Sequence, residues 1–246
     1  MLKKRLIIAL TFLDGVLFRT KKFKPDYRYT KNFVDLWSID EIILIDLSEK
    51  KFQNNFLNTI KFFSENCFVP LTVGGGIKNL ENAITYFNYG ADKIILGSGS
   101  IIEEGGLIEK ISNIYGSQSI IQSVDCKREN GNYKLAIRSG TILKDIDPIY
   151  ASKKALKLGA GEIMINNVDN DGSLLGYDID YLSIVSKKLE CPVLALGGAG
   201  NWSHIVDLFK LTSITGACTQ NIFHFTEESI SSAKNFLIQN EILVRN

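Results

Sequence analysis

The chain has 246 residues, of which 45% are hydrophobic and 22% charged, and its 28 basic and 27 acidic residues leave a formal net charge of +1. This composition is that of a globular protein with enough apolar residues for a full core. The near-neutral charge removes any overall electrostatic argument for nucleic acid or a membrane surface as a partner. We therefore expect partners among small molecules and other proteins.

The N-terminus and the cysteines bear on the cellular compartment. The first residues, MLKKRLIIALTFLDG, begin like a signal peptide, but the apolar stretch is short and reaches Asp14 and Gly15 without a small-residue cleavage site. A buried first strand explains the stretch better, and no apolar run is long enough to span a bilayer. The cysteines form no paired motif, which argues against a zinc site and a disulfide framework. We expect a cytoplasmic protein without metal or cofactor.

Short β-branched runs alternate with longer amphipathic stretches along the whole chain. Each run is almost continuously apolar, as parallel strands buried on both faces must be. We predict strands over residues 5–11, 41–47, 69–73, 92–97, 119–125, 162–168, 192–196 and 213–219. Helical patterns lie between them at 52–65, 80–89, 107–116, 148–159, 178–189 and 202–211, and a further one closes the chain at 227–240.

This alternation predicts the class of fold. Eight strands, each followed by a helix, within about 250 residues fit an α/β protein with a (βα)8 or TIM barrel. A doubly wound open sheet is the alternative, but it would need fewer strands and a glycine-rich turn after the first one. No linker or break in composition divides the chain, so we expect one domain over residues 1–246.

Two pairs of segments are similar to each other at a separation of half the chain. DEIILID (40–46) is similar to GEIMINN (161–167), and VPLTVGGGIKNL (69–80) is similar to CPVLALGGAGNW (191–202). Repeats with so long a period indicate half-barrels rather than solenoid units. The predicted barrel is therefore built from two half-barrel repeats.

Two segments depart from the regular alternation. Residues 17–30 form a long basic stretch with interleaved aromatic residues, which we expect to be a mobile loop that folds over a phosphorylated ligand. Residues 126–140 contain the turn sequence Glu129-Asn130-Gly131-Asn132 between strand-like flanks and predict a hairpin. Both segments follow the C-terminal ends of strands, the face on which barrel enzymes carry their chemistry.

Glycine-rich turns follow two of the strands, at Gly74-Gly75-Gly76 and Gly197-Gly198-Ala199-Gly200. Glycines between a strand and a helix let backbone amides approach an anion closely, so each turn is a candidate phosphate site. A tight structural turn explains either motif alone. Two such turns related by the repeat favour a ligand with a phosphate at each end, and we expect the segment Asp169-Asn170-Asp171-Gly172 to supply further amides to the second.

Ionisable residues stand at both ends of the predicted strands. Asp125 ends the fifth strand and is our candidate acid or base, whereas Asp46 and Asp14 are better explained by bonds to loop amides. The opposite, N-terminal face carries two acids and two bases at strand starts. These residues are either solvated or close the barrel floor as a ring of ion pairs, and they are Arg5, Glu41, Lys93 and Glu162. His204 and His224 are interpreted as structural.

With these motifs in place, the chain resembles a known family, the cyclase subunit (HisF) of imidazole glycerol phosphate synthase. The resemblance covers essentially the whole chain. It is based on MLKKRLIIAL, PLTVGGGIKNLENA, GADKIILGS, GSQSIIQSVDCKR, RSG, GAGEIMINNVDNDGSLLGYD, LALGGAG and IFHF. Members are half-barrel repeats that take ammonia from a glutaminase docked on the N-terminal face. The ammonia crosses the barrel and attacks a doubly phosphorylated ribulosyl substrate.

The resemblance implies roles for residues at both ends of the barrel. The four strand-start charges match the family's ammonia gate, and Asp92 matches a contact to the glutaminase. Of the two catalytic aspartates, one matches Asp125, but Thr11 occupies the other position and cannot act as a carboxylate. Residues at phosphate or substrate positions that match or replace the family pattern are Asp46, Gly75, Gly76, Gly97, Ser98, Ser139, Asp171, Gly172, Leu196, Gly197, Gly198, Gln220 and Asn221.

The chain keeps the residues of the ammonia gate but has Thr11 at a catalytic position. This combination resembles one branch of the family. Its members are HisF-like proteins that work with a HisH-like glutaminase and a separate amidotransferase to install acetamidino groups on bacterial surface sugars. The alternatives are a cyclase in histidine biosynthesis and, less favoured, a phosphoribosyl-formimino isomerase. That isomerase shares the half-barrels and needs no glutaminase, so the four gate residues argue against it.

Overall fold

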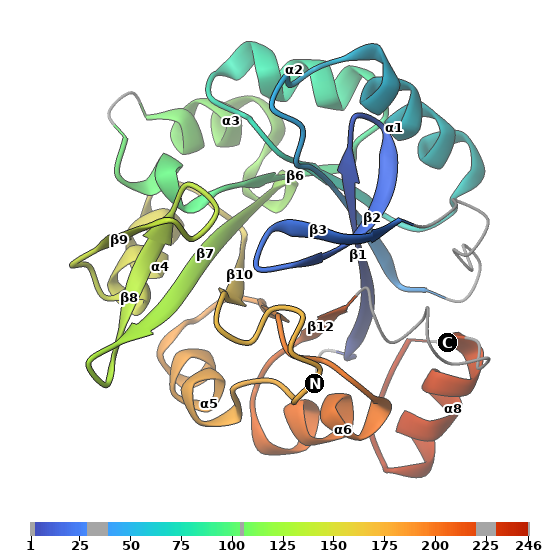
Figure 1. Ribbon diagram of the computed structural model, residues 1–246, viewed down its shortest axis with the longest axis vertical. Helices are drawn as coiled ribbons and strands as arrows, with labels where there is room; N and C mark the ends of the chain where they lie inside the picture. Colours follow the sequence, from blue (N-terminus) through green and yellow to red (C-terminus); the bar gives the residue numbers. More distant parts are fainter. Residues whose placement is uncertain (1–2, 29–38, 104–105, 220–229, 246) are drawn as a thin grey trace.

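A computed structural model of the chain describes residues 3–28, 39–103, 106–219 and 230–245. Eight parallel strands form a closed ring in which each strand pairs with the next and the last pairs with the first (Figure 1). They are β1 (Arg5–Leu13), β4 (Glu41–Asp46), β5 (Leu71–Gly74), β6 (Lys93–Leu96), β7 (Ile120–Glu129), β10 (Glu162–Asn167), β11 (Val193–Leu196) and β12 (Gly216–Thr219). The predicted (βα)8 barrel is confirmed, and each predicted strand has its counterpart.

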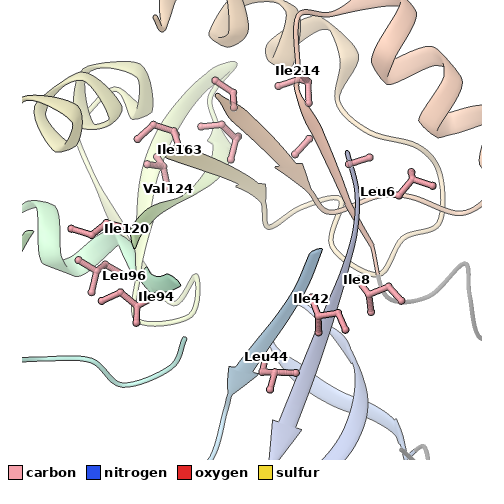
Figure 2. Close-up of a cluster of buried hydrophobic side chains, with 14 of the residues drawn as sticks. Leu6, Ile8, Ile42, Leu44, Ile94, Leu96, Ile120, Val124, Ile163 and Ile214 are labelled. Atoms are coloured by element: carbon pink, nitrogen blue, oxygen red, sulfur yellow. The ribbon is translucent and has the colours of Figure 1, made fainter. Parts of the chain in front are cut away.

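The barrel strands are apolar on both faces because each face has its own core. Side chains that point outward pack against the helices, and Figure 2 shows several of them, such as Leu6, Ile42 and Ile163. Side chains that point inward form a separate apolar cluster inside the barrel. Its members are Ile7, Ala9, Ile43, Ile95, Ile121, Met164, Leu194 and Cys218. Two-sided burial explains why these strands lack a polar alternation.

Helices surround the ring of strands (Figure 1). The described α-helices are α1 (Asn54–Asn66), α2 (Leu80–Asn88), α3 (Leu107–Tyr115), α4 (Pro148–Lys157), α5 (Ile179–Lys188), α6 (Trp202–Leu211) and α8 (Ile230–Gln239), with short 3-10 turns η2 (Ser98–Ile101) and η3 (Ser117–Ser119). Asn79 caps α2 and Asn201 caps α6 in the same way, since each side-chain oxygen accepts a hydrogen bond from the backbone amide three residues on. The half-barrel repeat therefore extends to the helix caps.

Two antiparallel extensions lie at the C-terminal ends of strands. The predicted hairpin is confirmed: β7 continues into β8 (Asn132–Ile137), with Asn130 and Gly131 at positive φ in the turn. A further strand, β9 (Ile142–Lys144), extends it.

The predicted loop after the first strand is wrong within its described part. Residues 17–28 lie in a hairpin of β2 (Val16–Lys21) and β3 (Lys24–Arg28), which crosses in front of the barrel strands in Figure 1. The turn that joins β1 to β2 is Asp14-Gly15, both at positive φ, which is a strong two-residue hairpin signal. The turn between β2 and β3 places Lys22 and Phe23 at positive φ without a glycine, so the sequence carries no signal for it.

Candidate functional site

Four charged side chains close the N-terminal end of the barrel as a ring of ion pairs, the charge ring. Arg5 Nη1 lies 3.0 Å from Glu41 Oε2, and Arg5 Nη2 lies 2.5 Å from Glu162 Oε2. Lys93 Nζ completes the ring at 3.4 Å from Glu41 Oε1 and 2.6 Å from Glu162 Oε1. Of the two interpretations left open by the sequence, solvated charges or a ring, the structure shows the ring.

The charge ring is largely shielded from water, which strengthens the attraction between its opposite charges. Glu41 is 1% exposed, and the hydroxyl of Thr72 donates to it over 2.9 Å. Burial alone would raise the pKa of Glu162, but the hydrogen bond and charge of Arg5, together with Lys93, overcome this and lower its pKa. Glu162 is therefore held as an anion by Arg5 and Lys93.

A hollow lies directly outside the charge ring. Arg5, Lys93 and Glu162 line it together with Asp92 and the segment from Cys67 to Leu71. Asp92 is exposed, and its carboxylate accepts from the backbone amide of Leu71 over 2.8 Å. The structure therefore places Asp92 beside the ring on the same outer face.

Above the charge ring, the barrel interior is apolar. The interior cluster fills this space, with Ile45 and Leu196 packed against its upper end. A narrow cavity begins there, at the C-terminal face. Its lining includes the cluster members Ala9 and Cys218, together with Thr11, Thr20, Phe23, Ile45, Leu47, Asn166, Asp171, Gly172, Leu196, Gly197, Gly198, Ala199 and Thr219. The charge ring and the cavity thus lie at opposite ends of one apolar interior.

Thr11 lines this cavity, but its hydroxyl is hydrogen-bonded to the neighbouring strand β2. Thr11 pairs with Phe18 of β2, and Thr11 Oγ1 donates to the Phe18 carbonyl oxygen over 2.6 Å. The hydroxyl of Thr20 lies 3.5 Å away. Thr11, which the resemblance aligns with a catalytic carboxylate, is therefore a neutral group that holds β1 to β2.

Asp125 is buried within a set of hydrogen-bond donors. Asn166 Nδ2 donates to Asp125 Oδ1 over 2.9 Å, and the hydroxyls of Ser123 and Ser98 lie within 3.2 Å of the carboxylate. Burial raises the pKa of Asp125, and these three hydrogen bonds oppose the rise. Among the described residues that line the cavity, Asn166 is present and Asp125 is not. The candidate acid or base is therefore connected to the cavity through its bond to Asn166.

The first glycine turn packs against Asp46 and Lys51. A side chain at Gly75 would overlap the Asp46 carbonyl oxygen, and one at Gly76 would overlap Lys51. Lys51 Nζ donates to the same carbonyl over 2.7 Å, and burial lowers the pKa of this lysine. Asp46 Oδ1 accepts from the amide and hydroxyl of Ser48, which agrees with the loop-binding role expected for this carboxylate.

The second glycine turn, in contrast, opens onto the cavity. Gly197 and Gly198 have φ near 100°, which favours glycine. Asp171 accepts from the backbone amide of Phe23 at the tip of the β2–β3 hairpin, and a Cβ at Gly172 would contact Lys21. The structure thus brings Thr11, Asp171, Gly172 and the second turn together under this hairpin.

The remaining predicted ligand residues lie apart from the cavity. Ser98 bonds to Asp125, and Gly97 and Ser139 are exposed. Gln220, Asn221 and His224 lie outside the described residues. His204 Nδ1 accepts from the Gly200 amide over 3.1 Å, which agrees with the structural role expected of it.

Sequence reasoning missed several residues of the site. Asn166 and Thr219 line the cavity, and Lys51 supports the first turn. Thr20 and Phe23 also line it, and they belong to residues 17–30, which were expected to fold over the ligand. Asn166 stands at the end of a predicted strand, opposite Asp125 in the β7–β10 register, and this placement was the available signal.

No described group of three His, Cys, Asp or Glu side chains could hold a metal ion. All four cysteines are free thiols. Across the part of the chain that the structure describes, every helix is too short or too polar to cross a bilayer.

These features define an α/β barrel protein made of two half-barrels, with a charged ring at one end of an apolar interior and a ligand cavity at the other. The histidine biosynthesis protein family matches residues 9–229 of the chain. Similar proteins are imidazole glycerol phosphate synthase subunits HisF from Clostridium botulinum (strain Kyoto / Type A2), at 35% identity, and from Chlorobium limicola, at 36%. Both alignments cover 100% of both chains. The chain belongs to this histidine biosynthesis family and is a HisF-like enzyme subunit.

Proposed function

We propose that the chain is the ammonia-accepting subunit of a glutamine-dependent synthase. A HisH-like glutaminase docks on the N-terminal face, and its ammonia enters the barrel through the charge ring. The observation that carries this proposal is the closed ring of Arg5, Glu41, Lys93 and Glu162 at the base of an apolar interior. A buried ring of four charges is costly to keep for stability alone, since apolar residues pack there at least as well.

The outer surface of the ring supports docking of a partner. The hollow there is lined by ring members and by Asp92, and Phe68 on its rim is 81% exposed. Lys93 is the most exposed member of the ring, with 17% of its side chain accessible. Movement of Lys93 would open the ring from the side on which the partner docks.

At the other end of the barrel, we propose that the delivered ammonia serves acetamidino modification of a surface-polysaccharide sugar, together with a separate amidotransferase. By the family resemblance, Thr11 replaces a catalytic aspartate and Leu196 replaces a serine. In the structure, Thr11 donates to Phe18 and Asp125 accepts from Asn166. A phosphorylated ligand would lie beside Gly172 and the second glycine turn. These changes favour altered chemistry over the family's cyclisation.

The second candidate function is that of a cyclase subunit in histidine biosynthesis. The similar proteins carry that name, and Asp125 persists with a raised pKa, as suits a general acid. In this case Asp125 acts without a second aspartate at Thr11, or another carboxylate replaces the missing one.

We predict that stimulation of the glutaminase by this chain disappears in Lys93→Ala and in Asp92→Ala. The first change opens the charge ring, and the second removes an exposed carboxylate beside it. Glutamine hydrolysis is measured with and without the barrel subunit, and complex formation is followed by gel filtration. Lys61→Ala, on the exposed face of α1, is the control and should stimulate like the unmodified chain. Full stimulation by both test variants would contradict the docking and gate assignments.

A further inference from the structure

Asn166 has a buried polar atom whose partner is missing from the described residues. The residue is 3% exposed, and its Nδ2 is bonded to Asp125. Its Oδ1 has no hydrogen-bond partner among the described residues. It lies on the cavity side, 3.5 Å from the point that a Cβ on Gly197 would occupy. A buried acceptor left without a donor costs about 1–3 kcal/mol, so this atom marks the place of a ligand donor.

Asp125 determines which end of the Asn166 amide faces the cavity. The Asp125 carboxylate accepts from the hydroxyls of Ser123 and Ser98, so it acts as an acceptor and the Asn166 amide turns its Nδ2 toward it. The reverse orientation would bring two oxygens together at 2.9 Å. The carboxylate therefore keeps Asn166 Oδ1 directed into the cavity.

The apolar floor of the cavity limits which hydrogen-bond donors reach Asn166 Oδ1 through the barrel interior. Ala9 and Cys218 belong both to the cavity lining and to the apolar interior cluster. A molecule that crosses this interior must be small and uncharged, because an ion would lose its hydration there. Ammonia meets this condition, and ammonium does not.

We propose that Asn166 Oδ1 accepts a hydrogen bond from ammonia as it leaves the barrel interior. This inference rests on the proposed ammonia route. A neutral amide oxygen binds an N–H of ammonia and leaves the nitrogen lone pair directed away, available for attack. A carboxylate in the same place would favour protonation to ammonium, which is not a nucleophile. Asn166 is thus a binding residue for the nucleophile, and Asp125 is the positioning residue that orients it.

The test is a nuclear magnetic resonance titration of the full-length, 15N-labelled chain. The side-chain amide signals of Asn166 are assigned by their loss in Asn166→Leu, or in Asn166→Thr if the leucine variant does not fold. Ammonium chloride is added at alkaline pH, where ammonia is abundant, and at mildly acidic pH, where it is scarce. Potassium chloride controls for salt. Asn167 is an internal control, because its amide bonds to Asp178 and to the backbone amide of Asp169.

The expected result is a saturable shift of the Asn166 signals at alkaline pH, absent at acidic pH and with potassium chloride, while the Asn167 signals stay in place. Absence of any shift would overturn the inference. A shift with ribose 5-phosphate and not with ammonia would also overturn it, because the donor would then be a sugar hydroxyl. This titration needs neither glutaminase nor turnover. A negative result with intact glutaminase stimulation would therefore refute the role of Asn166 and leave the proposed function standing.

Discussion

Replacement of Arg5 by methionine should lower the free energy of unfolding by about 3–5 kcal/mol at neutral pH, because it leaves two buried glutamates with a single cation. Glu41 and Glu162 are 1% and 8% exposed, and Arg5 contacts both at 3.0 Å or less. Urea unfolding measured by circular dichroism checks this value. Lys61→Met removes an exposed ion pair and should change stability by no more than about 0.5 kcal/mol.

The same variant should show a characteristic pH dependence. The pKa of Glu162 is lowered in the folded chain, so this residue contributes stability above its unfolded pKa of about 4.3 and loses the contribution as the pH falls through the folded value. Protonation in acid removes the unpaired charges of the variant. The difference in stability between Arg5→Met and the unmodified chain should therefore shrink as the pH is lowered toward 4. A difference independent of pH would show that lost packing, and not charge, is responsible.

The second large effect is expected for Gly198→Ala, which should destabilise the chain by roughly 2–5 kcal/mol. Gly198 has φ of 109°, and an added Cβ would overlap the Gly176 carbonyl oxygen. The Gly176 amide also donates to the Gly198 carbonyl oxygen over 2.8 Å, so the two segments cannot separate without losing a bond. A change of 1 kcal/mol moves Tm by about 2–4 °C in a domain of this size. Thermal unfolding should therefore occur at least about 4 °C lower.

Gly97→Ala is the matched control for this glycine. Gly97 also follows a barrel strand, but its φ of −74° suits any residue and no atom lies within 4 Å of an added Cβ. Its Tm should equal that of the unmodified chain. Equal Tm values for both variants would mean that the second turn relaxes freely, which is incompatible with a rigid cradle beside the cavity.

The barrel was predictable because strands that are buried on both faces are recognised in the sequence as runs of apolar residues. Strands such as β4 and β10 contain the apolar runs Ile42–Ile45 and Ile163–Ile165, and their similarity exposed the repeat. The β2–β3 hairpin was not predicted. Its turn at Lys22 and Phe23 has no glycine, and its tip is held by Asp171, a contact between residues far apart in the sequence.

The site was predictable where its residues end strands, and less so where tertiary contacts decide their role. The four residues of the charge ring begin predicted strands, so the sequence assigned them to one face of the barrel. Their burial depends on closure of the barrel and not on local sequence. Thr11 and the second glycine turn were found, and both line the cavity. Asn166 was missed because an asparagine at a strand end is ordinary until its register opposite Asp125 is known.

The most direct test of the account supplies the purified chain with the bisphosphorylated ribulosyl substrate and a high concentration of ammonium salt. Free ammonia bypasses the glutaminase, and loss of substrate absorbance follows turnover. We predict no turnover, while a HisH-like glutaminase is still activated on mixing. Turnover at an enzyme-like rate that is abolished by Asp125→Asn would contradict the account and establish a histidine-pathway cyclase.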